Sequence, residues 1–208
     1  DHFFRRLPTP DELFRSEARG HSSFLNGEYR LIDCLADDNE SLIVARFERE
    51  AEASGICRVR VEKSVTLYRS GEFARSFFAS YKIINTGIDT MDAWIGIENN
   101  YALMAGNAHD RYYRHDGCVN AGPLKTISDF GSRKWLELRD EYNNIALRLK
   151  YDNAPDCVQV FPVLTVSQSE GGFESVYQSS ATFSFYHLKL APGAVRLVSF
   201  VQETGPCQ

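Results

Sequence analysis

The feature that most constrains the fold is a two-residue alternation of apolar and polar side chains that runs through most of the chain. The clearest case is the segment 145–151, in which every second residue is Ile, Leu or Tyr. Successive side chains of a β-strand point to opposite faces of a sheet, so this pattern gives one buried and one solvated face. Comparable strand-like runs cover residues 42–47, 59–68, 77–84, 94–104, 135–138, 158–166, 181–190 and 195–201.

Turn-forming pairs separate these runs. They are Asn26-Gly27, Ser70-Gly71, Asp116-Gly117, Gly171-Gly172 and Pro192-Gly193. Many strands with turns between them and no recurring helices favour a sandwich or barrel over a βαβ fold. No internal repeat or low-complexity linker divides the run of strands. We therefore predict an all-β domain over residues 21–208, a large two-sheet antiparallel β-sandwich.

The first 20 residues have a different character. Thr9-Pro10-Asp11-Glu12 places a hydroxyl at a helix N-cap, a proline at the first helical position and a glutamate three residues after the cap. This is a capping box, so a short helix is expected here, ending at Gly20. We interpret residues 1–20 as a connecting segment. The chain begins at Asp1 without a methionine, and we expect it to be a piece of a longer or processed protein.

Composition and charge exclude several classes of partner. The 23 Lys and Arg residues against 28 Asp and Glu leave a formal charge of -5, and no basic run is present, so we expect no nucleic-acid partner. No apolar run approaches the roughly 20 residues that span a bilayer, so no membrane partner is expected either.

The cysteines give no sign of a metal site or of a disulfide framework. Their number is odd and no C-x-x-C pair occurs; they are Cys34, Cys57, Cys118, Cys157 and Cys207. We expect reduced, mostly buried thiols in a cytoplasmic protein. The acidic stretch 37–40 lacks the spacing of a calcium loop and is interpreted as a solvated turn. We predict no cofactor and no metal.

Polar side chains are densest between residues 165 and 178. Ser167, Gln168, Ser169, Glu170 and Glu174 crowd one glycine-containing turn beside aromatic residues. Amides and carboxylates next to aromatic rings suit sugars, since hydroxyl groups both donate and accept hydrogen bonds while a ring packs on the C–H face. The alternative is a hairpin whose side chains satisfy their own backbone.

A second polar concentration lies between residues 94 and 113. Trp94, Glu98 and Asn100 are spaced to share one face of a strand, which makes a plausible saccharide platform. The alternative is structural, with a buried Glu98 paired to Arg111. Tyr112 belongs either to this platform or to an exposed loop that covers a sheet edge.

The sequence names no catalytic machinery. It contains no H-x-x-x-H pattern, no G-x-S-x-G elbow, no Walker loop and no dinucleotide fingerprint.

Several segments together resemble a known family. Residues 161–180 contain Pro162 and the stretch Thr165-Val166-Ser167-Gln168-Ser169-Glu170, followed by Phe173-Glu174 and Tyr177-Gln178. Residues 97–106, with Asp110-Arg111-Tyr112-Tyr113 after them, and residues 1–4 support the same assignment. The chain resembles the C-terminal domain of glycoside hydrolase family 57 enzymes of the α-amylase and 4-α-glucanotransferase type.

This resemblance implies a galactose mutarotase-like sandwich that accompanies a separate catalytic barrel. Retaining chemistry needs two carboxyl groups roughly 5 Å apart, and the family places them in an N-terminal barrel that this chain lacks. The expected partners are that barrel and an α-glucan or maltooligosaccharide. No catalytic residue is carried over. The carbohydrate-binding candidates are Trp94, Glu98, Asn100, Tyr112, Gln168 and Glu170.

Three hypotheses follow. The first is a non-catalytic accessory domain that packs on a catalytic barrel and helps to hold α-1,4-glucan. The second is a stand-alone mutarotase-type enzyme, with Glu98 or Glu170 as base and one of His109, His115 and His187 as acid. The third is a purely structural module, in which the polar candidates are buried and hydrogen-bonded to protein.

Overall fold

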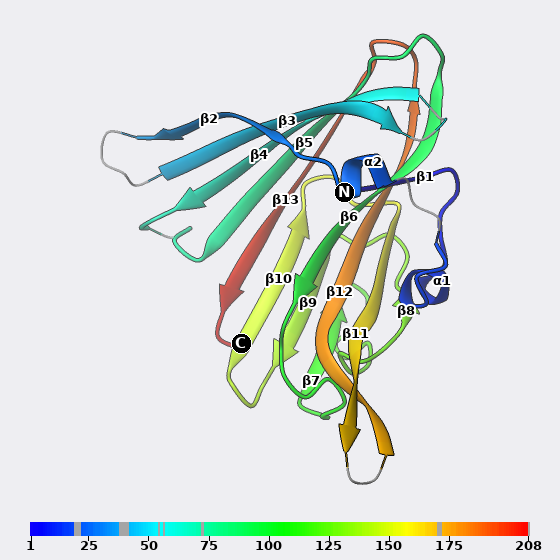
Figure 1. Ribbon diagram of the computed structural model, residues 1–208. Helices are drawn as coiled ribbons and strands as arrows, with labels where there is room; N and C mark the ends of the chain where they lie inside the picture. Colours follow the sequence, from blue (N-terminus) through cyan, green and yellow to red (C-terminus); the bar gives the residue numbers. More distant parts are fainter. Residues whose placement is uncertain are drawn as a thin grey trace.

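A computed structural model describes residues 1–18, 22–37, 42–53, 55, 57–71, 73–169 and 172–207. Its strands form two antiparallel sheets that face each other (Figure 1). The prediction of a large two-sheet antiparallel sandwich with a short N-terminal helix is confirmed.

The larger sheet has eight strands in the order β2-β3-β4-β5-β13-β10-β9-β7. In chain order these are β2 (Arg30–Ala36), β3 (Leu42–Ala53), β4 (Cys57–Tyr68), β5 (Ser76–Asn85), β7 (Arg111–His115), β9 (Trp135–Asp140), β10 (Ile145–Tyr151) and β13 (Val195–Gly205). The smaller sheet has five strands in the order β1-β6-β12-β11-β8. They are β1 (His2–Phe4), β6 (Met91–Tyr101), β8 (Ser128–Asp129), β11 (Cys157–Ser169) and β12 (Gly172–Leu190).

The core lies between the two sheets and follows the alternation in the sequence. In β10, Leu147, Leu149 and Tyr151 are buried while Lys150 is exposed, as the two-residue period requires. The bounds of β10 coincide with the predicted run 145–151. Across the sandwich, Ile95 of β6 and Tyr186 of β12 belong to the same apolar cluster.

Four strands were not predicted from the alternation. β1 and β8 contain only three and two residues, too few to show a period. Along β2 all residues but Asp33 are exposed, so the strand has no buried face to mark it. The interpretation of residues 110–113 as an exposed loop is wrong beyond Asp110, because β7 begins at Arg111 and is hydrogen-bonded to β9.

The predicted capping box is present at α1 (Pro10–Phe14). The backbone N–H of Thr9 donates to Glu12 Oε2 over 2.9 Å, and the N–H of Glu12 donates to Thr9 Oγ1 over 3.3 Å. The helix ends at Phe14, earlier than predicted, and residues 19–21 lie outside the described residues. A second helix, α2 (Ser22–Leu25), was not predicted.

The N-terminal segment is attached to the smaller sheet. β1 pairs with β6, and Phe3 of β1 is completely buried against Phe24. On the outer face of that sheet, Leu7 and Leu13 pack with a cluster formed by Phe4, Cys157, Phe183 and Phe185. The division of the chain at residue 20 stays a prediction.

The five cysteines are free thiols, and only Cys157 is buried. The expectation of mostly buried thiols is therefore wrong: Cys34 lies on the exposed strand β2, and the other three are half-buried. The described part of the chain contains no helix that is long and apolar enough to cross a membrane.

Candidate functional site

The five carbohydrate-binding candidates that the structure describes do not come together in one place. Trp94, Glu98 and Asn100 lie on the outer face of the five-stranded sheet, the face that the N-terminal segment partly covers. Tyr112 is in β7, at the edge of the other sheet. Gln168 is near the end of β11. Glu170 lies outside the described residues.

Glu98 is held by hydrogen bonds within the protein. His2 Nε2 of β1 lies 2.7 Å from Glu98 Oε2, and Asn100 donates its side-chain N–H to Glu98 Oε1 over 2.9 Å. The hydrogen bond from His2 keeps the pKa of Glu98 below its usual range, against the opposing effect of burial. The predicted alternative partner is wrong, because Arg111 lies beside Asp110 and Asp140 at 2.6 and 3.4 Å. The contact between His2 and Glu98 therefore links β1 to β6.

Trp94 is half-buried and already has a stacking partner. Its ring lies 4.8 Å from that of His187, at an interplanar angle of 26°. His187 Nε2 in turn lies 2.7 Å from Asp92 Oδ1. One face of the indole is therefore occupied by protein.

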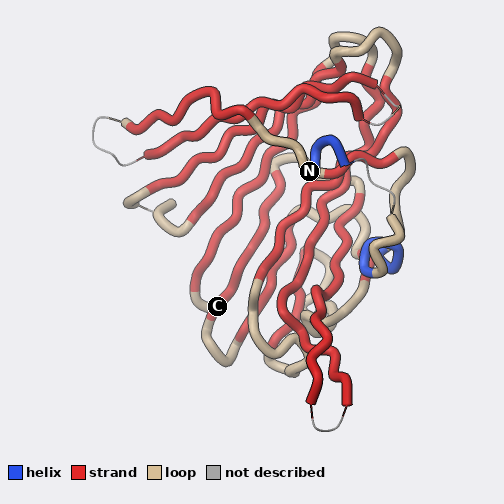
Figure 2. The backbone as a smooth tube through the Cα atoms, viewed as in Figure 1, coloured by secondary structure: helices blue, strands red, loops and turns tan. Residues whose placement is uncertain are grey.

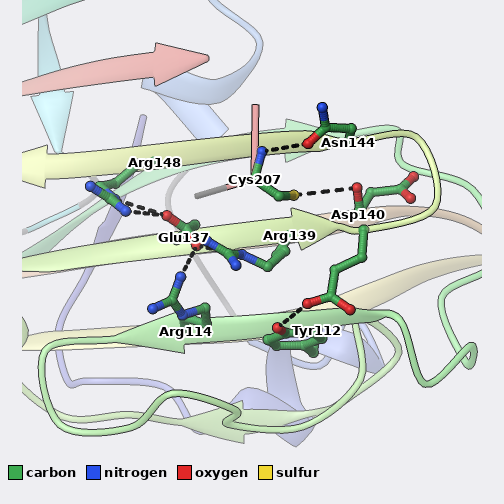
Figure 3. Close-up of polar contacts among 9 residues, drawn as sticks. Tyr112, Arg114, Glu137, Arg139, Asp140, Asn144, Arg148 and Cys207 are labelled. Atoms are coloured by element: carbon green, nitrogen blue, oxygen red, sulfur yellow. Dashed lines mark hydrogen bonds and ion pairs between the residues drawn. The ribbon is translucent and has the colours of Figure 1, made fainter. Parts of the chain in front are cut away.

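Tyr112 lies beside a charge cluster that sequence analysis missed (Figure 3). Its hydroxyl donates to Glu141 Oε1 over 2.6 Å. Next to it, three arginines from three neighbouring strands converge on Glu137, which is 0% exposed: Arg114 and Arg139 contact Oε1 at 2.9 and 3.0 Å, and Arg148 contacts Oε2. Burial opposes ionisation of Glu137, but the hydrogen bond from Arg148 and the three positive charges keep its pKa below the usual value.

A two-stranded arm carries Gln168. We call residues 164–169 of β11 and 172–178 of β12 the arm, and in Figures 1 and 2 these two strands run on past the body of the sandwich. Their register places Gln168 directly opposite Phe173, so the amide and the ring share one face. Phe173 is 81% exposed. A β-bulge between Val163 and Leu164 marks the start of the arm.

An open hollow of about 620 Å³ lies at the base of the arm. The segment after β6 and the start of β12 meet here, and they belong to the two stretches that carried the family resemblance. A Cβ atom on Gly106 would lie 2.6 Å from the ring of Tyr177, so this close approach requires glycine. The lining consists of Met104, Ala105, Gly106, Asn107, Ala108, Lys125, Ser175, Val176, Tyr177 and Gln178.

A third feature is an uncovered apolar face on the larger sheet. In Figures 1 and 2, β2, β3 and β4 fan out beyond the five-stranded sheet. Ile43 is paired with Leu67, and Leu67 with Phe77, which packs against the core, so Ile43 and Leu67 face inward. Leu31 faces the same way, because its partner Phe47 lies four residues from Ile43 on β3. Leu31, Ile43 and Leu67 are nevertheless 54%, 42% and 47% exposed. We call these three residues the overhang.

The described residues do not assemble the Glu–His pair of the mutarotase hypothesis. Glu98 binds His2, His187 is paired with Asp92, and a ring nitrogen of His115 accepts from the N–H of Gly117. Nor do the described residues contain a group of three or more His, Cys, Asp or Glu side chains placed to hold a metal ion.

Solved structures of several proteins share this sandwich. A putative aldose 1-epimerase from Escherichia coli K12 aligns with a TM-score of 0.64 at 13% identity, over 90% of this chain and 72% of the epimerase. A galactose mutarotase-like protein from Clostridium acetobutylicum aligns with a TM-score of 0.61 at 8% identity, over 97% of this chain and 73% of that protein. The fold is therefore that of the galactose mutarotase-like sandwiches.

Within that class the family is clear. The model of the family described as alpha-amylase/4-alpha-glucanotransferase, C-terminal, matches residues 1–196, and the chain belongs to this family. Alpha-amylase 1 of Dictyoglomus thermophilum is 25% identical over 192 residues. The 4-alpha-glucanotransferase of Thermococcus litoralis aligns with a TM-score of 0.67 at 20% identity, over 99% of this chain. The chain spans only 26% and 27% of the lengths of these two relatives.

Proposed function

We propose that this chain is a non-catalytic accessory domain of an α-glucan-active amylase or 4-α-glucanotransferase of the glycoside hydrolase family 57 type. It packs on the catalytic domain of the longer protein and helps to hold the glucan. The family match and the short share of its relatives' length support this proposal. We assign no catalytic residue to it.

The overhang is the observation that carries the packing role. Monomeric proteins rarely leave large contiguous apolar patches in water, and such patches mark interaction sites. The overhang continues the inward face of the sandwich past the edge of the smaller sheet, so burial against another domain would extend the existing core.

The position of Asp1 supports the same partner. Tyr29, just before β2, donates its hydroxyl to the Asp1 carboxylate over 2.8 Å. Leu31 of the overhang follows two residues after Tyr29, in β2. A catalytic domain that precedes Asp1 would therefore reach the sandwich close to the overhang.

Hydroxyl-radical footprinting tests the packing role by comparing the isolated chain with the full-length gene product. We expect Leu31, Ile43 and Leu67 to be labelled in the isolated chain and protected in the full-length protein. Ile88, which is 91% exposed between β5 and β6, serves as the control and should be labelled in both. Equal labelling of the overhang in both proteins, or a gene product no longer than this chain, would refute the proposal.

A purely structural module is the second candidate function. The hydrogen bonds of Glu98 to His2 and Asn100 favour it for that part of the molecule. We also propose a cytoplasmic location, which the five free thiols support because disulfides are rare in that compartment.

A further inference from the structure

The packing role concerns the overhang and does not explain the exposed aromatic and polar side chains of the arm. We infer that one face of the arm, with the hollow at its base, is a contact site for an α-1,4-glucan chain. This inference deepens the proposed function and rests on it, since it names where the domain would meet the substrate of its enzyme.

Phe173 and Gln168 supply the two kinds of contact that a sugar needs. The exposed ring of Phe173 offers an apolar surface on which the C–H face of a pyranose packs. Gln168, directly opposite it, carries both a carbonyl acceptor and an amide donor, which matches hydroxyl groups that donate and accept. The pair thus combines a stacking platform with a neutral hydrogen-bonding group.

The same face leads from the tip of the arm to the hollow. Ser175 and Tyr177 follow Phe173 at two-residue intervals on β12, and the strand pairing keeps them on one side. At about 3.3 Å per residue, Phe173 and Tyr177 are roughly 13 Å apart along the strand. A surface of this length suits an oligosaccharide better than a single sugar.

The hollow adds further polar groups at the end of this path. Asn107 and Lys125 line it, and its volume of about 620 Å³ lies within the usual range of ligand sites, roughly 300–1,000 Å³. Between the hollow and Phe173 the face carries Val166, Gln168 and Ser175, all uncharged. The uncharged side chains on this face of the arm fit a neutral polyhydroxyl ligand.

The base of the arm is fixed by hydrogen bonds and by packing. The hydroxyls of Tyr177 and Ser180 lie 2.7 Å apart, and Ser180 also donates to the carbonyl of Leu124 over 3.1 Å. Gln178 donates to Thr165 Oγ1 across the two strands over 2.9 Å. Because these contacts hold the two strands in place, less conformational entropy is lost when a ligand binds.

Calorimetric titration of the chain with maltoheptaose tests the inference, with glucose as the comparison sugar. We expect saturable binding of maltoheptaose and much weaker binding of glucose. Phe173→Ala should weaken binding by about tenfold, the effect of losing one ring contact, and Phe173→Trp should retain binding. Gln168→Ala should weaken it severalfold. Leu197→Ala, at an exposed apolar position on β13, is the matched control and should bind like the native chain.

Three results would overturn the inference. One is no heat with millimolar maltoheptaose. Another is unchanged binding by Phe173→Ala, which would place a glucan site elsewhere on the domain. The third is protection of Phe173 by the full-length protein without glucan, which would make the arm a protein contact. None of these three results would contradict the packing role, because the footprinting of the overhang tests that role separately.

Discussion

Replacing Glu137 by Ala should strongly destabilise the domain. The carboxylate is 0% exposed and is the common partner of Arg114, Arg139 and Arg148. Its removal leaves three guanidinium groups clustered without the central negative charge, on strands whose hydrogen bonds hold them side by side. Breaking a buried charge network by removing one partner typically costs 3–5 kcal/mol.

The effect is measurable by urea and thermal unfolding at pH 7. For a chain of this size, 1 kcal/mol corresponds to roughly 2–4 °C, so the melting temperature should fall by about 6–20 °C. Glu62→Ala is the matched control, because Glu62 also faces a cation across neighbouring strands but is more than one-third exposed. Exposed pairs are worth about 0–1 kcal/mol, so this variant should unfold near the native midpoint.

The pH dependence provides an independent check on the Glu137 argument. Because the folded-state pKa of Glu137 is lowered, its contribution is present above the ordinary glutamate pKa, about 4.3, and disappears as the pH falls through the folded value. The gap in stability between the native chain and Glu137→Ala should therefore narrow in acid. A loss of less than about 1 kcal/mol at neutral pH would show that the arginines do not depend on this carboxylate.

Two further changes test how the N-terminal segment is held. Gly96→Ala places a Cβ 2.6 Å from the ring of Phe185 and should cost about 1–3 kcal/mol in urea unfolding, whereas Gly205→Ala, with no atom within 4 Å, should be near neutral. Equal midpoints for both would contradict the close packing. Glu98→Gln should speed hydrogen exchange of the β1 amides at neutral pH, and this difference should shrink in acid, since the lowered pKa of Glu98 means that its stabilising effect is lost as the pH falls. Unchanged exchange would show that the His2–Glu98 contact does not hold β1.

The alternation in the sequence predicted the sandwich because most of its strands have one face in a continuous core. β10 was predicted to the residue, and the capping box located the start of α1. β2 was not predicted because both of its faces are largely exposed, so its residues do not alternate between buried and exposed. A strand that is held in a sheet only by its backbone hydrogen bonds shows little alternation of apolar and polar residues.

The site was less predictable, because its residues are related by register rather than by spacing. Glu98 and Asn100 were correctly placed on one face, but His2, which bonds to Glu98, is 96 residues away and was not predicted as its partner. The cluster around Glu137 joins residues of β7, β9 and β10, and no short sequence motif indicates that these residues meet. Gln168 was identified from composition, whereas Phe173 was only one of the aromatic residues beside that turn.

The two contact surfaces that we propose lie where one sheet extends beyond the other. At one end the larger sheet extends beyond the smaller one, and the overhang exposes apolar residues that another domain can bury. At the arm the smaller sheet extends instead, and it exposes an aromatic ring opposite an amide. Sheets of unequal extent leave strand faces outside the core, and the residue types on each face are the basis of the two proposals: a protein partner for the aliphatic overhang and a sugar for the arm.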